Sequence, residues 1–372
     1  MKTKIHTKKT RLTLQLVPAM TILVALALSI PMSAQTVTTF DAPGAGTGAF
    51  QGTFAFNIEP SGTIIGFLRD SGDVRHGFIR SRNGNYTIFD APGAGMSAGQ
   101  GTRAYSANPS GTITGFFIDS AGSAHGYVRY PDGTITAFDV PGAVGTFPFS
   151  PLIINPSGQI AGYYTDANGA GHGFLRETDG TFATFDVPGA GTGAGEGTYS
   201  YAISKRGDIT GYYIDNDDAS HGFLRDTNGL ITTFDVPGSG TGPGQGTYGG
   251  GFTANGTIMG NYFDSDNISH GFLRDKRGNF LSFDAPGAGG VPDSFEGTYP
   301  FGINPQGGIS GWYVDDSDVN HCFVRGADGE FHTFDVPGAG DGVFVFGINP
   351  NGASTGYSYD PGNVVHGFVA TK

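Results

Sequence analysis

NPSGTITGFFIDSAGSAHGYVRYPDGTITAFDVPG, residues 108–142, is one copy of a unit that recurs along the 372-residue chain. The copy holds three markers: a Gly-x-Ile-x-Gly run, a His-Gly-aromatic triplet and a Phe-Asp-x-Pro-Gly turn. Gly111 precedes Asp119 by eight residues, and Asp119 precedes His125 by six. Asp139 follows His125 by 14. These intervals hold in every copy that extends so far, and the unit recurs about every 49 residues, a period typical of repeat folds.

Each unit is expected to form four short antiparallel strands. In this copy three of them are expected over Ile113–Asp119, His125–Arg129 and Thr134–Asp139, and the first corresponds to Phe54–Asn57 of the preceding copy. β-Branched and aromatic residues dominate these segments, and Pro/Asp/Gly turns separate them. Four strands at this period are typical of a propeller blade. The sequence therefore predicts an all-β, seven-bladed β-propeller with four antiparallel strands per blade.

The chain begins and ends out of phase with the unit. Val37–Asp41 is a fourth strand with no blade before it, and His366–Val369 is a third strand with no fourth strand after it. We expect Thr36–Asp41 to pair with Val365–Thr371 in the C-terminal blade. That pairing would close the ring and remove the exposed sheet edges that invite aggregation.

Residues 1–34 have the order of a secretory signal peptide. A basic start is followed by the apolar stretch Leu14–Ile30 and by small residues ending at Ser33-Ala34. The alternative is an uncleaved membrane anchor, but the apolar core Met20–Ile30 is shorter than the ~20 residues of a spanning helix. We expect cleavage after Ala34, a secreted or periplasmic domain at 35–372, and no membrane insertion afterwards.

This domain is strongly acidic. The leader holds five of the 20 basic residues and none of the 33 acidic ones, so the rest of the chain has a net charge of −18. That charge argues against nucleic acid and anionic membranes, which bind basic patches. The single cysteine, Cys322, cannot form an internal disulfide, so packing must hold the fold. A monomer is expected.

Asp and His recur on the face that carries the second-to-third and fourth-to-first connections, named here the linker face. A His between two carboxylates resembles a metal or acid–base site, but a real site is normally single. Seven equal copies favour a structural hydrogen-bond network, and the Arg that stands four residues after six of the seven His is expected to pair with a carboxylate. The network residues are Asp41, Asp70, His76, Asp90, Asp119, His125, Asp139, Asp166, His172, Asp186, Asp215, His221, Asp235, Asp264, His270, Asp284, Asp315, His321, Asp335, Asp360 and His366.

Three successive loops on this face are acidic. Their alternating Asp and Asn oxygens suit Ca²⁺, although no loop has the full Asp-x-Asp-x-Asp-Gly run. A calcium site and a solvated acidic rim are both open alternatives, and no other cofactor is expected. The candidate calcium ligands are Asp215, Asp217, Asp264, Asp266, Asp315 and Asp318.

A second candidate site is a ring of polar residues next to the glycine that starts the first strand. If the first strand lines the axis, these side chains would surround the mouth of a central channel and, with exposed Tyr and Phe, hold a sugar or a cation. They are Gln51, Gln100, Glu196, Gln245, Glu296 and Asp341. The linker Pro141–Ile154 also differs from the others, because it is shorter and contains Phe147-Pro148-Phe149.

The units resemble the HAF-type probable extracellular repeat, named for its His-Ala-Phe core. Here the core is His-Gly-Phe or His-Gly-Tyr, with one His321-Cys322-Phe323, preceded by Asn-x-x-Gly-x-Ile-x-Gly and followed by an Arg and a Gly-containing turn. The resemblance covers nearly all of Thr36–Thr371. Gly replaces the family's Ala, and Phe-Asp-x-Pro-Gly replaces its usual ending. The resemblance implies an exported bacterial repeat protein and supplies no catalytic residues.

Uniform units, export and variation confined to the linkers favour a secreted binding or scaffold protein, with a glycan or a surface protein as partner. The alternative is a hydrolase or lyase that acts on a polysaccharide or small molecule through Asp and His of the linker face. No catalytic residue is assigned, because the nucleophile-elbow, zinc-protease and phosphate-loop motifs are absent from the sequence. One set with strongly perturbed carboxylates in a deep pocket would favour the enzyme.

Overall fold

The computed structural model describes residues 35–144, 152–340 and 342–371. Within these ranges the chain forms strands, turns and loops but no helix, so no described helix could cross a membrane. The predicted signal peptide, the Phe147-Pro148-Phe149 segment and Asp341 lie outside the described residues.

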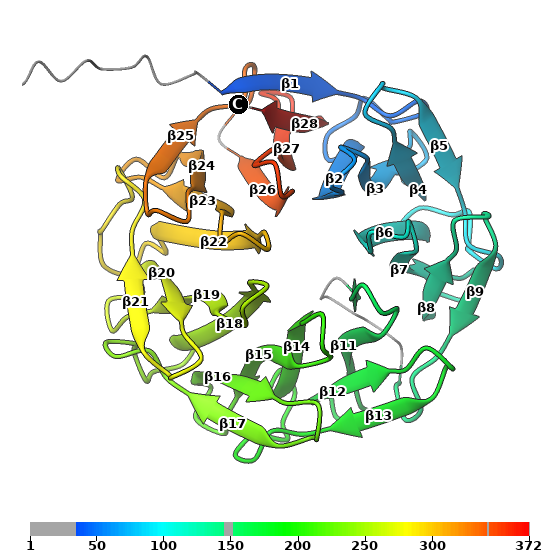
Figure 1. Cartoon of the computed structure of the whole chain (residues 1–372). Coiled ribbons are helices and arrows are strands. Elements are labelled where there is room, and N and C mark those ends of the chain that lie inside the picture. The colour runs from blue at the N-terminus through cyan, green and yellow to red at the C-terminus, as the bar shows by residue number, and fades with distance from the viewer. Residues whose placement is uncertain (1–34, 145–151, 341, 372) are drawn as a thin grey trace, which may run out of the picture. The chain divides into compact units, whose positions relative to one another are not determined.

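The strands follow one another in sets of four, arranged radially around one axis (Figure 1). The innermost strands are β2 (Gly52–Ile58), β6 (Gly101–Ala107), β10 (Ile153–Ile154), β14 (Gly197–Ile203), β18 (Gly246–Phe252), β22 (Gly297–Ile303) and β26 (Val343–Ile348). The second strands are β3 (Ile64–Arg69), β7 (Ile113–Ile118), β11 (Ile160–Thr165), β15 (Ile209–Ile214), β19 (Ile258–Phe263), β23 (Ile309–Val314) and β27 (Ser354–Tyr359).

The third strands are β4 (Arg75–Arg80), β8 (Ala124–Arg129), β12 (Gly171–Arg176), β16 (Ser220–Arg225), β20 (Ser269–Arg274), β24 (Asn320–Arg325) and β28 (Val365–Thr371). The outermost strands are β5 (Tyr86–Phe89), β9 (Ile135–Phe138), β13 (Phe182–Phe185), β17 (Ile231–Phe234), β21 (Phe280–Phe283), β25 (Phe331–Phe334) and β1 (Thr36–Phe40). We number the sets as units: unit 1 is β2–β5, unit 2 is β6–β9, unit 3 is β10–β13, unit 4 is β14–β17, unit 5 is β18–β21, unit 6 is β22–β25, and unit 7 is β26–β28 with β1.

Strands pair antiparallel within a unit, as β2 with β3, β3 with β4 and β4 with β5. Single parallel residue pairs join the third strand of one unit to the innermost strand of the next, for example Arg75 with Gly101. Only glycine fits there, because Gly101 has a φ of +99° and a Cβ would lie 2.1 Å from the Arg75 carbonyl oxygen. These contacts join the strands into two sheets of 12 and 16 strands.

Unit 7 is built from both ends of the chain. β1 pairs antiparallel with β28, with Thr36 opposite Thr371 and Phe40 opposite Gly367. The two strands lie side by side in Figure 1. The pairing of Thr36–Asp41 with Val365–Thr371 expected from the two partial units is therefore present in the structure.

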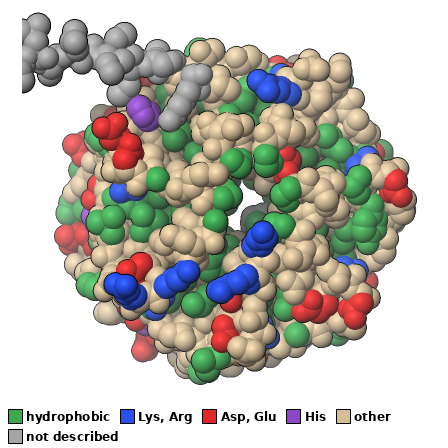
Figure 2. All heavy atoms as spheres, in the orientation of Figure 1, with side chains coloured by type: hydrophobic (Ala, Val, Ile, Leu, Met, Phe, Trp, Pro, Cys, Tyr) green, Lys and Arg blue, Asp and Glu red, His purple; other side chains and the backbone are tan. Residues whose placement is uncertain are grey.

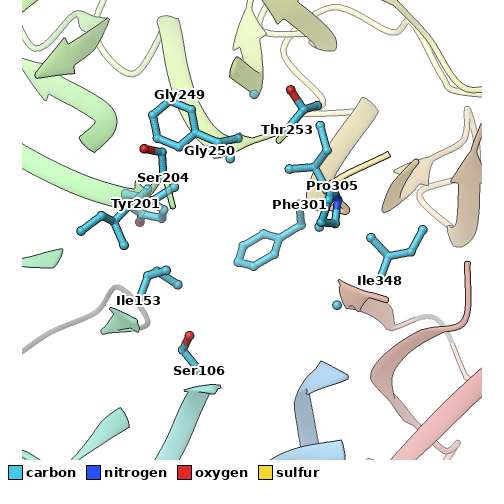
Figure 3. Close-up of a pocket in the computed structure, with 18 of the residues that line it drawn as sticks. Ser106, Ile153, Tyr201, Ser204, Gly249, Gly250, Thr253, Phe301, Pro305 and Ile348 are labelled. Atoms are coloured by element: carbon cyan, nitrogen blue, oxygen red, sulfur yellow. The ribbon is translucent and has the colours of Figure 1, made fainter. Parts of the chain in front are cut away.

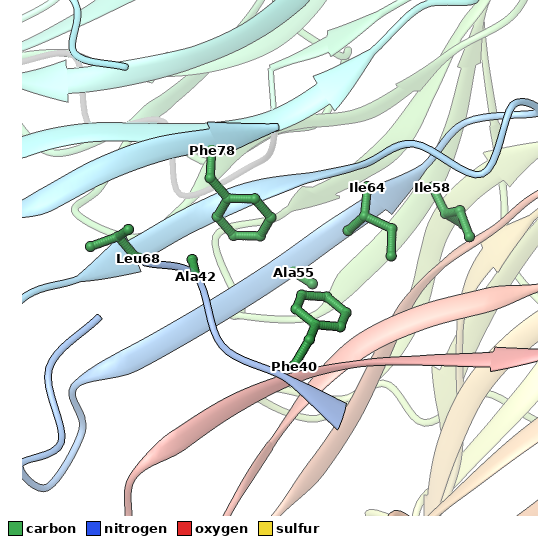
Figure 4. Packing of buried hydrophobic residues seen from close by; sticks show 7 residues of the cluster. All are labelled: Phe40, Ala42, Ala55, Ile58, Ile64, Leu68 and Phe78. Carbon is green, nitrogen blue, oxygen red and sulfur yellow. The ribbon is translucent and has the colours of Figure 1, made fainter. Parts of the chain in front are cut away.

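The hydrophobic core is divided into clusters that lie within and between units. Figure 4 shows one that joins β1 to unit 1; it contains Phe40, Ala42, Ala55, Ile58, Ile64, Leu68 and Phe78. Each unit alone would leave such faces exposed, so the stability of the fold depends on contacts between neighbouring units.

The Arg that stands four residues after a His contacts an aromatic ring of the neighbouring unit. The prediction that it pairs with a carboxylate is wrong. Arg80 lies over the Phe40 ring, with 4.5 Å between the guanidinium carbon and the ring centroid. The equivalent contacts measure 4.7–5.0 Å and pair Arg129 with Phe89, Arg176 with Phe138, Arg225 with Phe185, Arg274 with Phe234 and Arg325 with Phe283. In these six cases the Phe of a Phe-Asp motif meets the Arg of the next unit in a cation–π contact, whereas unit 7 has Ala370 at the Arg position.

Candidate functional site

The predicted Asp–His–Asp sets come together on the linker face. In unit 2 the His125 Nδ1 lies 2.7 Å from Asp139 Oδ1, and its Nε2 lies 3.3 Å from Asp119 Oδ2. Across the sets the first distance is 2.7–2.9 Å and the second 3.2–3.7 Å. In unit 7 the Nδ1 partner of His366 is Asp41, which follows β1. The sets are close to equal in geometry.

The first Asp of each set also holds the turn that follows it. Asp119 Oδ1 accepts the backbone N–H groups of Ala121 and Ser123 at 2.9 and 2.8 Å. The hydrogen bond from Ser123 and its neighbours lowers the pKa of Asp119. Burial lowers the pKa of His125, but its hydrogen bonds to Asp139 and Asp119 outweigh burial and leave that pKa above the usual value. The arrangement thus favours an imidazolium between two carboxylates.

The acidic loops do not converge on a cation. Among the residues that the structure describes, no group of three or more Asp, Glu, His or Cys side chains is arranged to hold a metal ion. Asp215, Asp264 and Asp315 each use Oδ1 to accept two backbone N–H groups of their own loop. The side chains at 217, 266 and 318 are exposed. The candidate calcium ligands Asp215, Asp217, Asp264, Asp266, Asp315 and Asp318 are therefore not brought together, because these oxygens serve the turns or face solvent.

The predicted channel-mouth side chains hold the linkers. Gln51 Oε1 accepts the backbone N–H of Gly48, three residues upstream, at 3.0 Å. The corresponding bonds of Gln100, Glu196 and Gln245 measure 2.7–3.0 Å. Glu296 accepts the N–H of Val291 and is only 2% exposed. None of these five lines the axial cavity described next, and Asp341 lies outside the described residues.

A cavity of about 890 Å³ lies on the axis (Figure 3). Its wall consists of the C-terminal ends of the innermost strands and the turns after them, for example residues 201–206 and 248–256. Because strands alternate in direction, these turns lie on the face opposite the linker face, named here the turn face. The volume falls within the range of small-ligand sites, about 300–1,000 Å³. This cavity thus belongs to the turn face and not to the expected linker-face funnel.

A β-bulge recurs in the innermost strands beside this cavity. In β2 the register shifts between Ala55 and Asn57, so Phe56 has no partner residue on β3. Equivalent shifts occur in β6, β14, β18, β22 and β26. The bulged residues are Phe56, Tyr105, Tyr201, Gly250, Phe301 and Phe346, and all of them line the cavity. Bulges commonly re-aim a side chain next to a functional site.

The aromatic bulge residues form an interrupted wall. Tyr105 contacts Phe56 and Phe56 contacts Phe346 at centroid distances of 4.8 and 4.9 Å. Phe346 contacts Phe301 at 4.9 Å. Beyond Phe301 the next bulge residue is Gly250, and the wall resumes at Tyr201. Unit 5 therefore leaves a gap in the row of bulge aromatics at Gly250, which Figure 3 places between Tyr201 and Phe301. Two other aromatics of this unit, Tyr248 and Phe252, also line the cavity.

The gap is a local property of unit 5. A Cβ at Gly250 would meet nothing closer than the Met259 carbonyl oxygen at 3.4 Å, and Gly250 has no positive φ. At Gly249 a Cβ would lie 2.7 Å from the Gly211 carbonyl oxygen, and at Gly251 it would lie 2.6 Å from an Ile303 methyl group. A Cβ is sterically excluded at 249 and 251, but it makes only ordinary van der Waals contacts at 250.

Polar groups line the turn-face end of the cavity. Its charged residues within the described chain are Lys205, Arg206, Asp208 and Lys276. Asp208 is 9% exposed and accepts hydrogen bonds from Ser204 Oγ and Arg206 Nη2, both at 2.9 Å. The carboxylate is thereby neutralised, so the cavity carries a net positive charge in an acidic protein.

Asparagine side chains join the turns around this end of the axis. The Asn108 Nδ2 donates to the Asn155 carbonyl oxygen of the next unit, and Asn155 Nδ2 donates to that of Ser204. Asn304 Nδ2 donates to the Asn349 carbonyl oxygen, and Asn349 donates to that of Glu59. These bonds fix neighbouring turns relative to one another, so the rim of the cavity is preorganised.

Comparisons with known proteins identify the fold. No family model matches the chain, and no curated protein matches it. Virginiamycin B lyase from Staphylococcus aureus is similar in structure, with 13% identity, a TM-score of 0.59 and coverage of 91% of this chain and 100% of that one. The β-propeller domain of the trilobed protease from Pyrococcus furiosus has 9% identity, a TM-score of 0.54 and coverage of 85% and 95%.

The chain has a β-propeller fold. Puromycin hydrolase is a further similar structure, with 11% identity, a TM-score of 0.51 and coverage of 86% of this chain and 50% of that one. At these identities the similarity concerns the fold alone, because propellers carry unrelated functions.

Sequence reasoning missed the axial cavity, although the sequence carries two signals for it. One is the aromatic pair two residues apart in several innermost strands, such as Phe54 with Phe56 and Tyr199 with Tyr201. The other is the pair of Lys-Arg dipeptides that begin at Lys205 and Lys276 in an otherwise lysine-poor chain. The bulge that turns the second aromatic into the cavity leaves no mark in the residue pattern.

Proposed function

We propose that this protein is an exported, seven-bladed β-propeller that binds a glycan in its axial cavity. Each unit is one blade, the domain spans 35–372, and the β1–β28 pairing closes the ring. Closure is supported by the five residue pairs between β1 and β28 and by the bond of His366 to Asp41. The similar Pyrococcus domain is described as having an open velcro topology, so the fold alone does not imply closure.

The observation that carries the binding function is the aromatic lining created by the bulges. Flat rings in a concave site offer large apolar contact areas, and nearby hydroxyl and amide groups supply direction. The cavity combines Phe56, Tyr105, Tyr201, Phe301 and Phe346 with the polar residues Thr253, Asn255 and Asn261. Sugar rings present the matching combination of apolar faces and hydroxyl edges.

The alternative of a hydrolase or lyase that uses the linker-face Asp and His lacks a distinctive site. The Asp–His–Asp sets share the same partners and nearly the same distances, and their side chains do not line the axial cavity. A catalytic set would differ from its copies. Binding is therefore the better-supported function.

We also propose that the units are a His-Gly-Phe variant of the HAF-type repeat. The two departures from that repeat are coupled in space. A Cβ at Gly126 of His-Gly-Tyr would lie 2.4 Å from the ring of Phe138, the Phe of Phe-Asp. The ring occupies the place of an alanine methyl group, so the Gly and the Phe-Asp ending belong together.

The single tryptophan allows a direct test. Trp312 lies 5.9 Å from Phe346 and 6.2 Å from Phe301 between ring centroids, so its fluorescence reports on the cavity wall. We expect hits on an array of neutral and carboxylated oligosaccharides, and the binding oligosaccharide should change this fluorescence.

Matched variants separate the cavity from the surface. Tyr201→Ala should weaken binding about ten-fold, since an aromatic contact at the centre of a binding site is worth about 1–2 kcal/mol. Tyr130→Ala, which removes an exposed tyrosine away from the axial cavity, should leave affinity unchanged. The proposal fails if no oligosaccharide binds, or if both variants bind like the native protein.

A further inference from the structure

Lysine is almost absent from the propeller, and its two internal copies line the same cavity. Lys205 and Lys276 are the only lysines between Lys9 and the C-terminal Lys372. Both line the axial cavity. Lys205 lies in the turn between β14 and β15, and Lys276 lies in the turn between β20 and β21. Figure 2 shows Lys and Arg side chains beside the central opening on this face.

Neither lysine has a partner among the described residues. Both side chains are exposed, and no ion pair joins either of them to the described part of the chain. The nearby carboxylate, Asp208, is occupied by Ser204 and Arg206. The Lys276 side chain lies against the β18–β19 turn, which contains Gly256: its Cε is 3.3 Å from the position that a Cβ on Gly256 would take. Two ammonium groups without a counter-ion therefore stand at the mouth of the cavity.

The chain as a whole has a net charge of −13, so such a cluster is not explained by average composition. A concave site lined by charges of one sign concentrates the field and attracts the opposite charge. The cations lie in units 4 and 5, next to the gap in the aromatic wall at Gly250. The positive charges and the missing bulge aromatic thus coincide on one side of the axis.

We propose that the axial cavity binds a carboxylated sugar chain whose carboxylates pair with Lys205 and Lys276. One sugar ring occupies the space that Gly250 leaves between Tyr201 and Phe301. Asn255 and Asn261 lie on the same side and offer amide groups to hydroxyls. This inference rests on the proposed glycan-binding function and adds the charge class of the glycan and its orientation.

Reductive ¹³C-methylation tests the charge contact directly. The reaction labels lysine and the N-terminal amine and keeps the positive charge. Because so few lysines exist, Lys205→Arg and Lys276→Arg identify the two signals. The probes are trigalacturonate and its fully methyl-esterified form, which has the same rings without the charge. We expect the acid to shift both lysine signals and the ester to leave them nearly in place.

Charge variants give the affinity. Lys205→Gln and Lys276→Gln should each weaken trigalacturonate binding about ten-fold, because each removes a positive charge that pairs with a carboxylate of the sugar. Binding of the methyl ester should change by less than about two-fold in the same variants. Lys→Arg variants retain the charge and should retain most of the affinity for the acid.

The gap at Gly250 has its own pair of variants. Gly250→Tyr restores the aromatic that most units have at this position, and its Cβ fits without a clash. It should abolish trigalacturonate binding while thermal stability is maintained. Gly250→Ala, which leaves the gap largely open, should bind like the native protein.

The outcomes distinguish the two proposals. If acid and ester bind equally and the Lys→Gln variants are neutral, the charge inference is overturned and glycan binding stands. If Gly250→Tyr folds and binds the acid normally, the assignment of the ring to the gap is overturned. If neither probe binds and the array also shows no hit, both the inference and the glycan-binding function are overturned.

Discussion

Phe40→Ala is the sharpest test of ring closure, because it removes one side chain from the strand that joins the two ends of the chain. Phe40 is 9% exposed and packs in the cluster of Figure 4 with residues of β2, β3 and β4. Its ring also covers Gly367, where a Cβ would lie 2.5 Å from the ring, and accepts Arg80 on its face. If β1 is docked in the native protein, Phe40→Ala removes the packing in this cluster, the cover over Gly367 and the contact with Arg80.

The expected cost follows from these contacts. Truncation of a buried Phe costs about 3–5 kcal/mol, and the partial exposure of Phe40 favours the lower half of that range. The cation–π contact contributes about 0.5–1 kcal/mol of it at a partly exposed site. The entropy of unfolding for a domain of this length is about 0.7 kcal/mol per kelvin, so a loss of about 3–4 kcal/mol lowers Tm by about 4–6 °C.

Differential scanning calorimetry of three variants provides the measurement and its controls. Phe89 occupies the same motif position in unit 1 and accepts Arg129, but its strand follows β4 directly through a hairpin. Phe89→Ala should therefore destabilise by a similar amount whether or not the ring closes. Thr39→Ala, at an exposed position of β1, should shift Tm by less than about 1 °C. A native Tm for Phe40→Ala beside a lowered Tm for Phe89→Ala would show that β1 does not close the ring.

Two further variants address the turns on the turn face. Burial raises the pKa of Glu59 from 4.5 to about 8. An acid whose pKa is higher in the folded state destabilises the fold as pH rises between these two values, so the native protein should lose about 2 kcal/mol of unfolding free energy across that window, after allowance for the partial exposure of Glu59. Urea unfolding at several pH values should show this decline in the native protein and not in Glu59→Gln. Asn304→Ser keeps a side-chain oxygen that can cap the turn, as Ser204 does, but loses the 3.0 Å hydrogen bond to the Asn349 carbonyl oxygen. This variant should lower the unfolding free energy by about 1 kcal/mol. An unchanged unfolding free energy would exclude a role of the asparagine hydrogen bonds in joining units.

Fixed intervals made most of the fold predictable. The eight-, six- and 14-residue spacings place Asp119, His125 and Asp139 at consecutive strand ends, and the structure brings their side chains together. The incomplete ends of the chain likewise predicted the β1–β28 pairing. The partner of the recurrent Arg was not predictable, because a stack on a Phe of the preceding unit depends on how units pack and not on any spacing within one.

The candidate site was less predictable for a geometric reason. Length variation in the linkers suggested a binding surface there, but side chains such as Gln51 tie each linker to its own backbone. The axial cavity depends on a one-residue bulge at Phe56 and its equivalents. In a regular strand, successive side chains point to opposite faces of the sheet. The extra residue at the bulge breaks this alternation, so a prediction from alternation alone places the side chains on one side of the β2 bulge on the wrong face.

Positions that repeat faithfully have little bonding capacity left for a ligand. His125 already has a carboxylate on each ring nitrogen, Gln51 holds its linker, and Arg129 covers Phe89. Lys205 and Gly250 break the repeat and leave a free ammonium group and free space. Selection for folding alone would favour the consensus aromatic at 250, since added apolar contact in a cavity stabilises a fold when it fits without strain. An unfilled position that sterics do not require, next to unpaired cations, is therefore the signature expected of a ligand site.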